Sequence, residues 1–338
     1  MPRITILHVI NIQNDMCLNP RLIRNKRFLP NKSNDFDPPE CDDERKRWVP
    51  IGCQLCIECR KKKANSWRVR IMEEIKNNRG GVFVTLSLSD ESIDKLQIDN
   101  NMDANDVATQ AVRYFLERVR AAYGVSIKHI FFTELGQHST QRIHLHGIVW
   151  YRHLFNDKEF TKLWKYGNIY FGSFCNERTG NYIVKYITKS DPLHKEFYSK
   201  CLCSKGIGLG YMDSSASKRN SFSDKDTKDY YRLNNGFKVQ LPDYYRHKIY
   251  TDEERDILWT NKLDEECRFV MGHKIDVSTP EGMDNYESAR KYHSNIDMRN
   301  GNLQLKYQFN KDRKEYKARC REIAYLTAER KRLNDDFG

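Results

Sequence analysis

The sequence predicts an α+β protein built on a mostly antiparallel central sheet that helices cover. Three segments, 82–88, 127–134 and 143–150, alternate between apolar and polar residues as half-buried strands do. Residues 103–123 have the periodicity of an amphipathic helix, and Gly124 supplies a stop signal. With a short helix at 156–166, a strand at 168–174 and a helix at 180–189, the order of elements suggests mainly antiparallel pairing.

Cysteines dominate the region before the sheet, which we take as an N-terminal region of residues 1–78. Cys53, Cys56 and Cys59 are separated by two residues each, the spacing found in zinc knuckles. Structural zinc, an iron–sulfur cluster and unmetallated thiols are all compatible with it. Cys17 and Cys41 are the candidates for a fourth ligand. Since residues 1–10 lack a secretory signal, we expect a reducing cytosol, where disulfides are rare.

A basic run follows the cysteines at the opening of a predicted helix. It consists of Arg60, Lys61, Lys62 and Lys63. Such a run can be a solvated helix face or a contact with a phosphate backbone, and both interpretations stay open.

The composition indicates a polyanionic partner. Lysine and arginine number 58 against 46 acidic residues, for a net charge of +12, and 19 tyrosines and 16 phenylalanines could stack on bases. Charge alone also fits a ribosome or a membrane surface. No apolar run approaches the ~18 residues of a membrane span, and no Walker-type glycine loop predicts a nucleotide cofactor.

Two histidines and a carboxylate form the candidate catalytic metal site. Alternation along 143–150 sends His144 and His146 to one face. If the preceding turn is symmetric about Ser139, Glu134 lies opposite His144, whereas a slip of one residue would send it to the other face. Two imidazoles and a carboxylate suit Mg²⁺ or Mn²⁺. The alternative is a pair of ordinary exposed strand histidines. A histidine-triad hydrolase is disfavoured because position 148 is isoleucine.

The segment 181–189 carries the candidate nucleophiles. As a helix, it places Tyr182 and Tyr186 one turn apart on the same face. Lys185 and Lys189 each follow a tyrosine by three residues and could stabilise a phenolate or phosphorane. The alternative is a half-buried amphipathic element without chemistry.

At these residues the sequence resembles the HUH endonucleases, the rolling-circle replication initiators. Residues 83–87 (Phe-Val-Thr-Leu-Ser), 144–146 (His-Leu-His) and 182–189 resemble their three motifs in order. Residues 16–20, 51–60 and 206–211 are similar to the replication initiator of gokushovirus-like Microviridae, single-stranded DNA phages. This resemblance also places a cysteine before a proline, which favours Cys17 as the fourth ligand of the cysteine cluster.

The resemblance implies an HUH-like fold with a nickase core at 79–195 and a C-terminal extension of helices and loops at 196–338. It implies a metal-dependent, site-specific DNA endonuclease and strand transferase, in which Tyr182 or Tyr186 nicks single-stranded origin DNA, forms a 5′-phosphotyrosine link and rejoins the product into a circle. His144, His146 and Glu134 would hold the ion. The partners would be supercoiled origin DNA, a host helicase and a single-strand-binding protein, in the cytoplasm of a bacterial host.

Two other functions remain possible. The first is a plasmid-type initiator or transposase of the same superfamily. The second is a non-catalytic, zinc-containing protein that binds single-stranded nucleic acid. In the C-terminal extension, Tyr230-Tyr231 and Tyr244-Tyr245, followed by the basic residues 246–248, fit either a strand-tracking groove or surface loops. Residues 311–333 are predicted to form a charged helix.

Overall fold

The computed structural model describes residues 17–97, 102–136, 141–189, 191, 193–194 and 197–300. Its main feature is a five-stranded sheet of order β6-β3-β5-β4-β7, in which every neighbouring pair is antiparallel. The strands are β3 (Val82–Ser87), β4 (Lys128–Leu135), β5 (Ile143–Trp150), β6 (Ile169–Phe174) and β7 (Cys201–Cys203). The predicted α+β class is confirmed. Edge strand β7 was not predicted, because three residues are too few to show alternation.

One face of the sheet is covered by α2 (Asp90–Leu96), α3 (Ala104–Tyr123) and α4 (Asp157–Trp164). Val84 and Leu145 are fully buried there against Phe115 of α3. Helix α3 begins at a capping box and ends where Gly124 adopts a φ of 71°, as its sequence predicts. Because side chains alternate along β5 and Leu145 points into this face, His144 and His146 lie on the opposite face.

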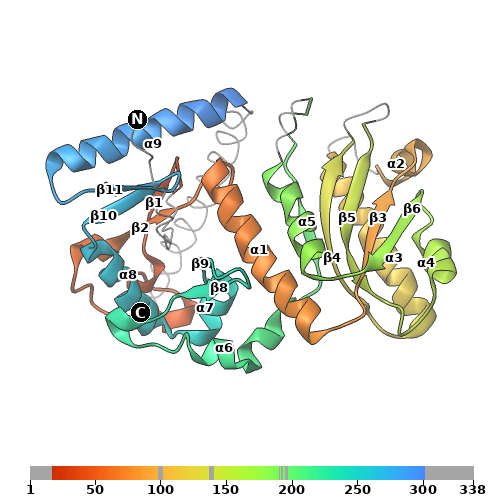
Figure 1. The fold of residues 1–338 in the computed structure, drawn as a ribbon, viewed down its shortest axis with the longest axis horizontal. Coiled ribbons are helices and arrows are strands. Elements are labelled where there is room, and N and C mark those ends of the chain that lie inside the picture. The colour runs from red at the N-terminus through yellow and green to blue at the C-terminus, as the bar shows by residue number, and fades with distance from the viewer. Residues whose placement is uncertain are drawn as a thin grey trace, which may run out of the picture.

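The opposite face packs against α1 (Ile57–Asn77) and α5 (Glu177–Thr188). Ile130 and Ile148 of the sheet are fully buried against Ile71 of α1 and Ile183 of α5. Helix α1 begins at Ile57, one turn before the basic run that we expected to open it. The five-stranded sheet with α1 to α5 is called the sheet lobe below, and Figure 1 shows it on the right.

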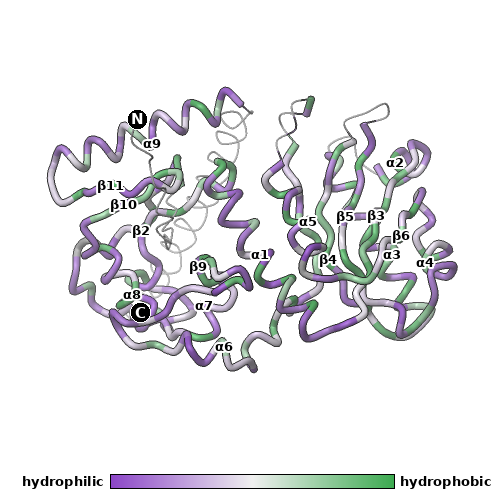
Figure 2. The backbone as a smooth tube through the Cα atoms, viewed as in Figure 1, coloured by the Kyte–Doolittle hydropathy of each residue, from purple (hydrophilic) through white to green (hydrophobic). Residues whose placement is uncertain are grey.

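The remaining elements form an accessory lobe on the left of Figure 1. They comprise β1 (Arg21–Arg24), β2 (Trp48–Ile51), α6 (Ser215–Lys218), β8 (Tyr230–Arg232), β9 (Lys238–Gln240), α7 (Asp243–Ile249), α8 (Asp252–Asp264), β10 (Cys267–Val270), β11 (His273–Asp276) and α9 (Pro280–Asn300), with short 3₁₀ turns between them. The strands pair as β1-β2, β8-β9 and β10-β11. Figure 2 shows that α9 is largely hydrophilic, whereas hydrophobic residues gather along the central sheet.

The tyrosine pairs of the accessory lobe are core residues in part. Tyr231 and Tyr245 are only 4% and 0% exposed and pack around Tyr211. Both predictions, a strand-tracking groove and surface loops, were therefore wrong for these two rings, because no periodicity in this segment separates inward from outward residues. The predicted helix at 311–333 lies outside the described residues.

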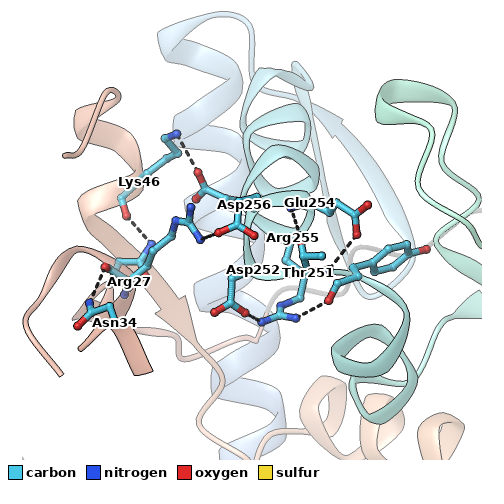
Figure 3. Close-up of polar contacts among 11 residues, drawn as sticks. Arg27, Asn34, Lys46, Thr251, Asp252, Glu254, Arg255 and Asp256 are labelled. Carbon is cyan, nitrogen blue, oxygen red and sulfur yellow. Dashed lines mark hydrogen bonds and ion pairs between the residues drawn. The ribbon is translucent and has the colours of Figure 1, made fainter. Parts of the chain in front are cut away.

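Ion pairs tie the N-terminal segment to α8 (Figure 3). The ammonium of Lys46, which is only 5% exposed, lies 3.0 Å from Asp256, and Arg27 lies 3.1 Å from Glu253. Because Lys46 is buried, loss of Asp256 would leave a buried charge with one fewer partner. No helix in the described part of the chain combines the length and apolar character needed to cross a membrane.

Candidate functional site

Helix α5 brings the two tyrosines together. Asn176 caps the helix through a capping box with Thr179, and Tyr182 and Tyr186 follow on one face. The Tyr186 hydroxyl donates a hydrogen bond to the Tyr182 hydroxyl over 2.9 Å. Tyr182 is 45% exposed, whereas Tyr186 is 6% exposed. The phenol that a large substrate can reach is therefore that of Tyr182.

Strand β5 presents both histidines on the face that α5 covers. His144 Nδ1 donates to the carbonyl of Arg142 over 2.7 Å, which leaves its Nε2 with a free lone pair. Burial lowers the pKa of His144, so its ring is neutral at neutral pH. His146 Nδ1 lies 3.1 Å from the hydroxyl of Thr85. A hydroxyl both donates and accepts, so Thr85 supports either tautomer of His146.

Glu134 lies on β4 directly opposite His144, in the register predicted from the sequence. One carboxylate oxygen lies 2.8 Å from His146 Nε2, and the other forms an ion pair with Lys189. Burial raises the pKa of Glu134, but the hydrogen bonds from His146 and Lys189 outweigh it and hold the pKa below its ordinary value. The carboxylate is therefore ionised at neutral pH.

The tyrosines and histidines meet face to face. The rings of His146 and Tyr186 stack with centroids 4.2 Å apart and an interplanar angle of 6°. Burial raises the pKa of Tyr186, and the hydrogen bond with Tyr182 and the charge of Glu134 raise it further. Tyr186 thus remains a neutral phenol in this arrangement.

The two lysines serve different groups. Lys185 Nζ lies 3.7 Å from the ring centroid of Tyr182 and 5.1 Å from that of Tyr186. Lys189 instead pairs with Glu134, whose charge it compensates. The sequence placed both lysines beside the tyrosines and did not separate these two environments.

By the chemistry of their ligand atoms, His144, His146 and Glu134 could hold a hard divalent cation such as Mg²⁺ or Mn²⁺. His144 offers Nε2, Glu134 offers a carboxylate oxygen, and His146 offers Nε2 once its proton is on the nitrogen facing Thr85. Among the described residues, only the cysteine cluster brings the ligand atoms of three or more residues within 4.8 Å of one another. The ligand atoms of His144, His146 and Glu134 are not gathered this closely. Thr85, which we did not single out as a site residue, shows itself in the sequence by alternating with buried Val84 and Leu86.

Four cysteines gather into a cluster that could hold a metal ion. The sulfurs of Cys17, Cys53, Cys56 and Cys59 all lie within 4.8 Å of one another. The backbone N–H of Cys53 donates to Cys17 Sγ over 3.0 Å, and that of Cys56 donates to Cys53 Sγ over 3.2 Å. Four such thiolates could bind a structural metal such as zinc. Cys41 bonds to the carbonyl of Asp43 instead, so Cys17 is the fourth member.

Hydrogen bonds among the sulfurs shift the pKa values of the thiols in opposite directions. Contacts with the other thiols lower the pKa of Cys53 and raise that of Cys59. Four thiolates packed this closely would repel one another without a cation between them. A bound dication would relieve this repulsion.

The basic run at 60–63 does not form one surface. Arg60 lies 3.3 Å from Asp297 of α9, Lys61 lies 3.1 Å from Glu58, and Lys62 lies 3.4 Å from Asp243. Lys63 has no carboxylate partner within the described ranges. The four predicted DNA-binding residues therefore divide between structural pairs and cations that could still meet phosphate.

Comparison with known families identifies one similarity. Residues 81–191 match the model of the family described as replication-associated protein ORF2/G2P. The match runs from β3 to α5 and includes Glu134, the histidine pair and both tyrosines of the site. It supports a replication initiator at the level of this family. No match was found among curated proteins or among solved structures.

Proposed function

We propose that this protein is a rolling-circle replication initiator that nicks single-stranded origin DNA through a tyrosine. The observation that carries the proposal is the stacking of Tyr186 on His146 at 4.2 Å, with the Tyr182 oxygen 2.9 Å from that of Tyr186. Two phenols thus lie against a histidine pair and a carboxylate. The match of residues 81–191 to a replication-associated family supports the same reaction class.

In the cleavage step, Tyr182 Oη attacks the scissile phosphorus in line with the departing 3′ oxygen. A P–O bond to tyrosine forms as the P–O bond to the 3′ oxygen breaks. The phenol proton passes to solvent, and the 3′ oxygen takes up a proton to become a free hydroxyl. Lys185, over the Tyr182 ring, places positive charge where the phenolate develops. The products are a 3′-hydroxyl that can prime synthesis and a 5′-phosphotyrosine.

His144, His146 and Glu134 would hold Mg²⁺ or Mn²⁺. When bound, such an ion polarises a non-bridging oxygen of the scissile phosphate. Two protein contacts orient these ligands: the Arg142 carbonyl fixes the tautomer of His144, and the Thr85 hydroxyl can accept a hydrogen bond from Nδ1–H of His146.

Two tyrosines allow a second cut and a closure. The phosphotyrosine link keeps the energy of the phosphodiester, so the step is reversible. After one circuit, Tyr186 would cut the regenerated origin, and the released 3′-hydroxyl would attack the Tyr182 phosphotyrosine to close a circle. Tyr186 must first leave its stacked position, because only 6% of it is exposed.

The resemblance to Microviridae initiators extends the proposal to its setting. The substrate would be the supercoiled origin of a small phage in the cytoplasm of a bacterial host. Strand separation would come from a host helicase, and the displaced strand would be covered by a single-strand-binding protein. No nucleotide cofactor is required for the strand transfer itself.

The test uses single-stranded oligonucleotides tiled across the replicon that encodes the chain. Each is incubated with protein and Mn²⁺, and covalent adducts are resolved on a denaturing gel. We expect an adduct with one tile, its loss in Tyr182→Phe plus Tyr186→Phe, and no change in Tyr292→Phe, an exposed tyrosine of α9. An adduct that survives the double substitution would refute the assigned nucleophiles. Binding without any adduct, unaffected by EDTA, would favour the non-catalytic nucleic-acid-binding alternative.

A further inference from the structure

We propose that a cleft between α1 and the accessory lobe binds a segment of single-stranded DNA at a second site that does no chemistry. The cleft has a volume of about 1090 Å³, slightly larger than the usual range for small-molecule pockets. Its walls come from residues 17–70 and 238–290, so it lies wholly outside the segment that matches the replication-associated family. The choice of DNA rests on the proposed function.

The cleft carries a strong positive charge. Nine lysines and arginines line it against two carboxylates, and five of the nine are in ion pairs, some of them with Asp229 and Asp252 outside the lining. Lys63, Arg70, Lys238 and Arg268 have no carboxylate partner among the residues that the structure describes. Cations gathered in a concave, low-dielectric wall attract a polyanion more strongly than the same cations spread over a surface.

Indole rings line the same cleft. Trp48, Trp67 and Trp259 all contribute to its walls, and Trp48 is 48% exposed. Arg70 lies 4.1 Å from the Trp67 ring and 4.0 Å from the Tyr244 ring, which fixes the position of its guanidinium. Rings interleaved with cations are the combination that stacks unpaired bases while phosphates are neutralised.

Two polar groups of the cleft have no hydrogen-bond partner among the residues that the structure describes. The hydroxyl of Tyr286, a residue only 4% exposed, makes no hydrogen bond to any described residue, and neither does the Trp259 indole N–H. A buried polar group without a partner is costly, and native structures satisfy nearly all of them. Both atoms are buried, so base or phosphate oxygens would reach them only if neighbouring side chains moved.

Helix α1 joins the cleft to the proposed nicking site. Trp67 lines the cleft, and its ring also meets Phe132 of β4 edge-on at 6.2 Å. Glu134 stands two residues further along β4, on the same face. A strand held in the cleft would therefore lie on the other side of one helix from the tyrosines, where it could retain DNA during the reaction.

Single-stranded DNA fits these features better than other polyanions. A duplex keeps its bases stacked inside and cannot offer them to recessed indole rings without unpairing. An acidic peptide would use the cations but would leave the rings unused. Single-stranded DNA, a duplex and an acidic peptide should therefore bind the cleft with different affinities.

The test measures fluorescence anisotropy of a labelled oligothymidylate of about 12 nucleotides with the full-length Tyr182→Phe, Tyr186→Phe protein as the reference. We expect Trp48→Ala to weaken binding by about 5- to 100-fold, with partial rescue by Trp48→Phe. Lys63→Gln plus Lys238→Gln should lower the salt slope of log K by about 0.7 per lysine. The matched controls Tyr292→Ala and Lys158→Gln plus Lys225→Gln, on exposed residues outside the cleft, should change neither quantity.

Three results would refute the cleft proposal: unchanged DNA binding in the cleft variants, binding of a duplex as tight as that of the single strand, or displacement of the probe by polyglutamate as effective as that by single-stranded DNA. Photocrosslinking of iodouracil-substituted probe to the unsubstituted protein gives an answer even if a variant misfolds: crosslinked peptides should contain Trp48 or Trp259, and crosslinks confined to β3 and α5 would contradict the proposal. If the cleft variants lose binding but the unsubstituted protein forms no tyrosine adduct, only the proposed function is refuted. If the adduct forms but the cleft variants bind as tightly as the reference, only the cleft proposal is refuted.

Discussion

The cysteine cluster and the tyrosine site both gather ionisable groups, but they satisfy them differently. In the cysteine cluster, four sulfurs lie within 4.8 Å of one another. Among the described residues, their hydrogen bonds come from backbone N–H groups and from one another. Around Glu134, each group has a complementary partner: His146 and Lys189 bind the carboxylate, and the Arg142 carbonyl accepts from His144. If all four sulfurs were ionised, the first arrangement would need a cation between them, whereas the charges of the second compensate one another.

If both sites bind metal as we propose, the ion would serve stability at the cysteine cluster and reaction rate at the histidine pair. Removing the ion from the cysteine cluster should loosen the accessory lobe and the start of α1. Removing it from the histidine pair should stop chemistry and leave the fold intact. Four predictions follow, from the largest expected effect to the smallest; three test this separation, and one tests the stability of the sheet lobe itself.

Cys56→Ser should produce the largest change in stability. Cys56 is fully buried, and its substitution removes one of four ligands from a site of the kind whose metal contributes about 10 kcal/mol or more. We expect zinc content, measured by mass spectrometry of metals, to fall from about one per chain to a small fraction, with Tm lower by about 10 °C or more. Cys41→Ser, outside the cluster, should alter neither quantity. Retention of a full zinc complement by Cys56→Ser would contradict the assignment.

Thr85→Val should slow adduct formation by about 10- to 100-fold without lowering Tm appreciably. The substitution removes the hydroxyl that lies 3.1 Å from His146 Nδ1 and leaves a side chain of similar shape. The half-saturating Mn²⁺ concentration should rise, because the tautomer that frees Nε2 loses its acceptor. Thr85→Ser should restore most of the rate. Equal rates in the valine and serine variants would show that Thr85 acts through packing alone.

Acid should destabilise the sheet lobe through His129. This residue is 8% exposed, and burial lowers its pKa. Below pH ~6.5, His129 therefore binds a proton more readily in the unfolded chain than in the folded one. Stability is full above the ordinary pKa of about 6.5 and falls as the pH drops below it, by at most about 1.4 kcal/mol per pH unit for one proton.

Urea unfolding at about pH 7.5 and about pH 5.5 measures this contribution. The loss for the native chain should exceed that for His129→Gln, and protonation of the cysteine cluster is common to both chains and cancels in the difference. Identical losses in the two proteins would remove His129 as the cause.

Lys189→Gln should have the smallest effect. Removing the ammonium from Glu134 makes the carboxylate more available to a cation, so the half-saturating Mn²⁺ concentration for adduct formation should fall by about 2- to 5-fold. Lys95→Gln, which breaks an exposed pair with Glu91, serves as the control. A higher Mn²⁺ requirement in Lys189→Gln would mean that the lysine assists the phosphate instead.

The sequence predicted most of the tyrosine site because that site depends on local periodicity. Alternation along two strands and a symmetric turn placed Glu134 opposite His144, and helical spacing paired Tyr182 with Tyr186. The separation of Lys185 from Lys189 was missed because it depends on the angle at which α5 packs on the sheet.

The cleft of the accessory lobe was not predictable in the same way. Trp48, Trp259 and Tyr286 come from distant parts of the chain, and no local pattern indicates that they line one surface. The same is true of buried Tyr231 and Tyr245, whose neighbours are cations that the sequence alone suggested were exposed. Tertiary packing, which spacing rules do not describe, decides both cases.

The position of the covalent link tests the central claim most directly. Trypsin cuts after Lys185, so Tyr182 and Tyr186 fall in different peptides, 179–185 and 186–189. We predict that mass spectrometry of the first-round adduct finds the nucleotide on 179–185, since Tyr182 is the exposed phenol. A nucleotide attached outside both peptides would contradict a nicking reaction centred on α5.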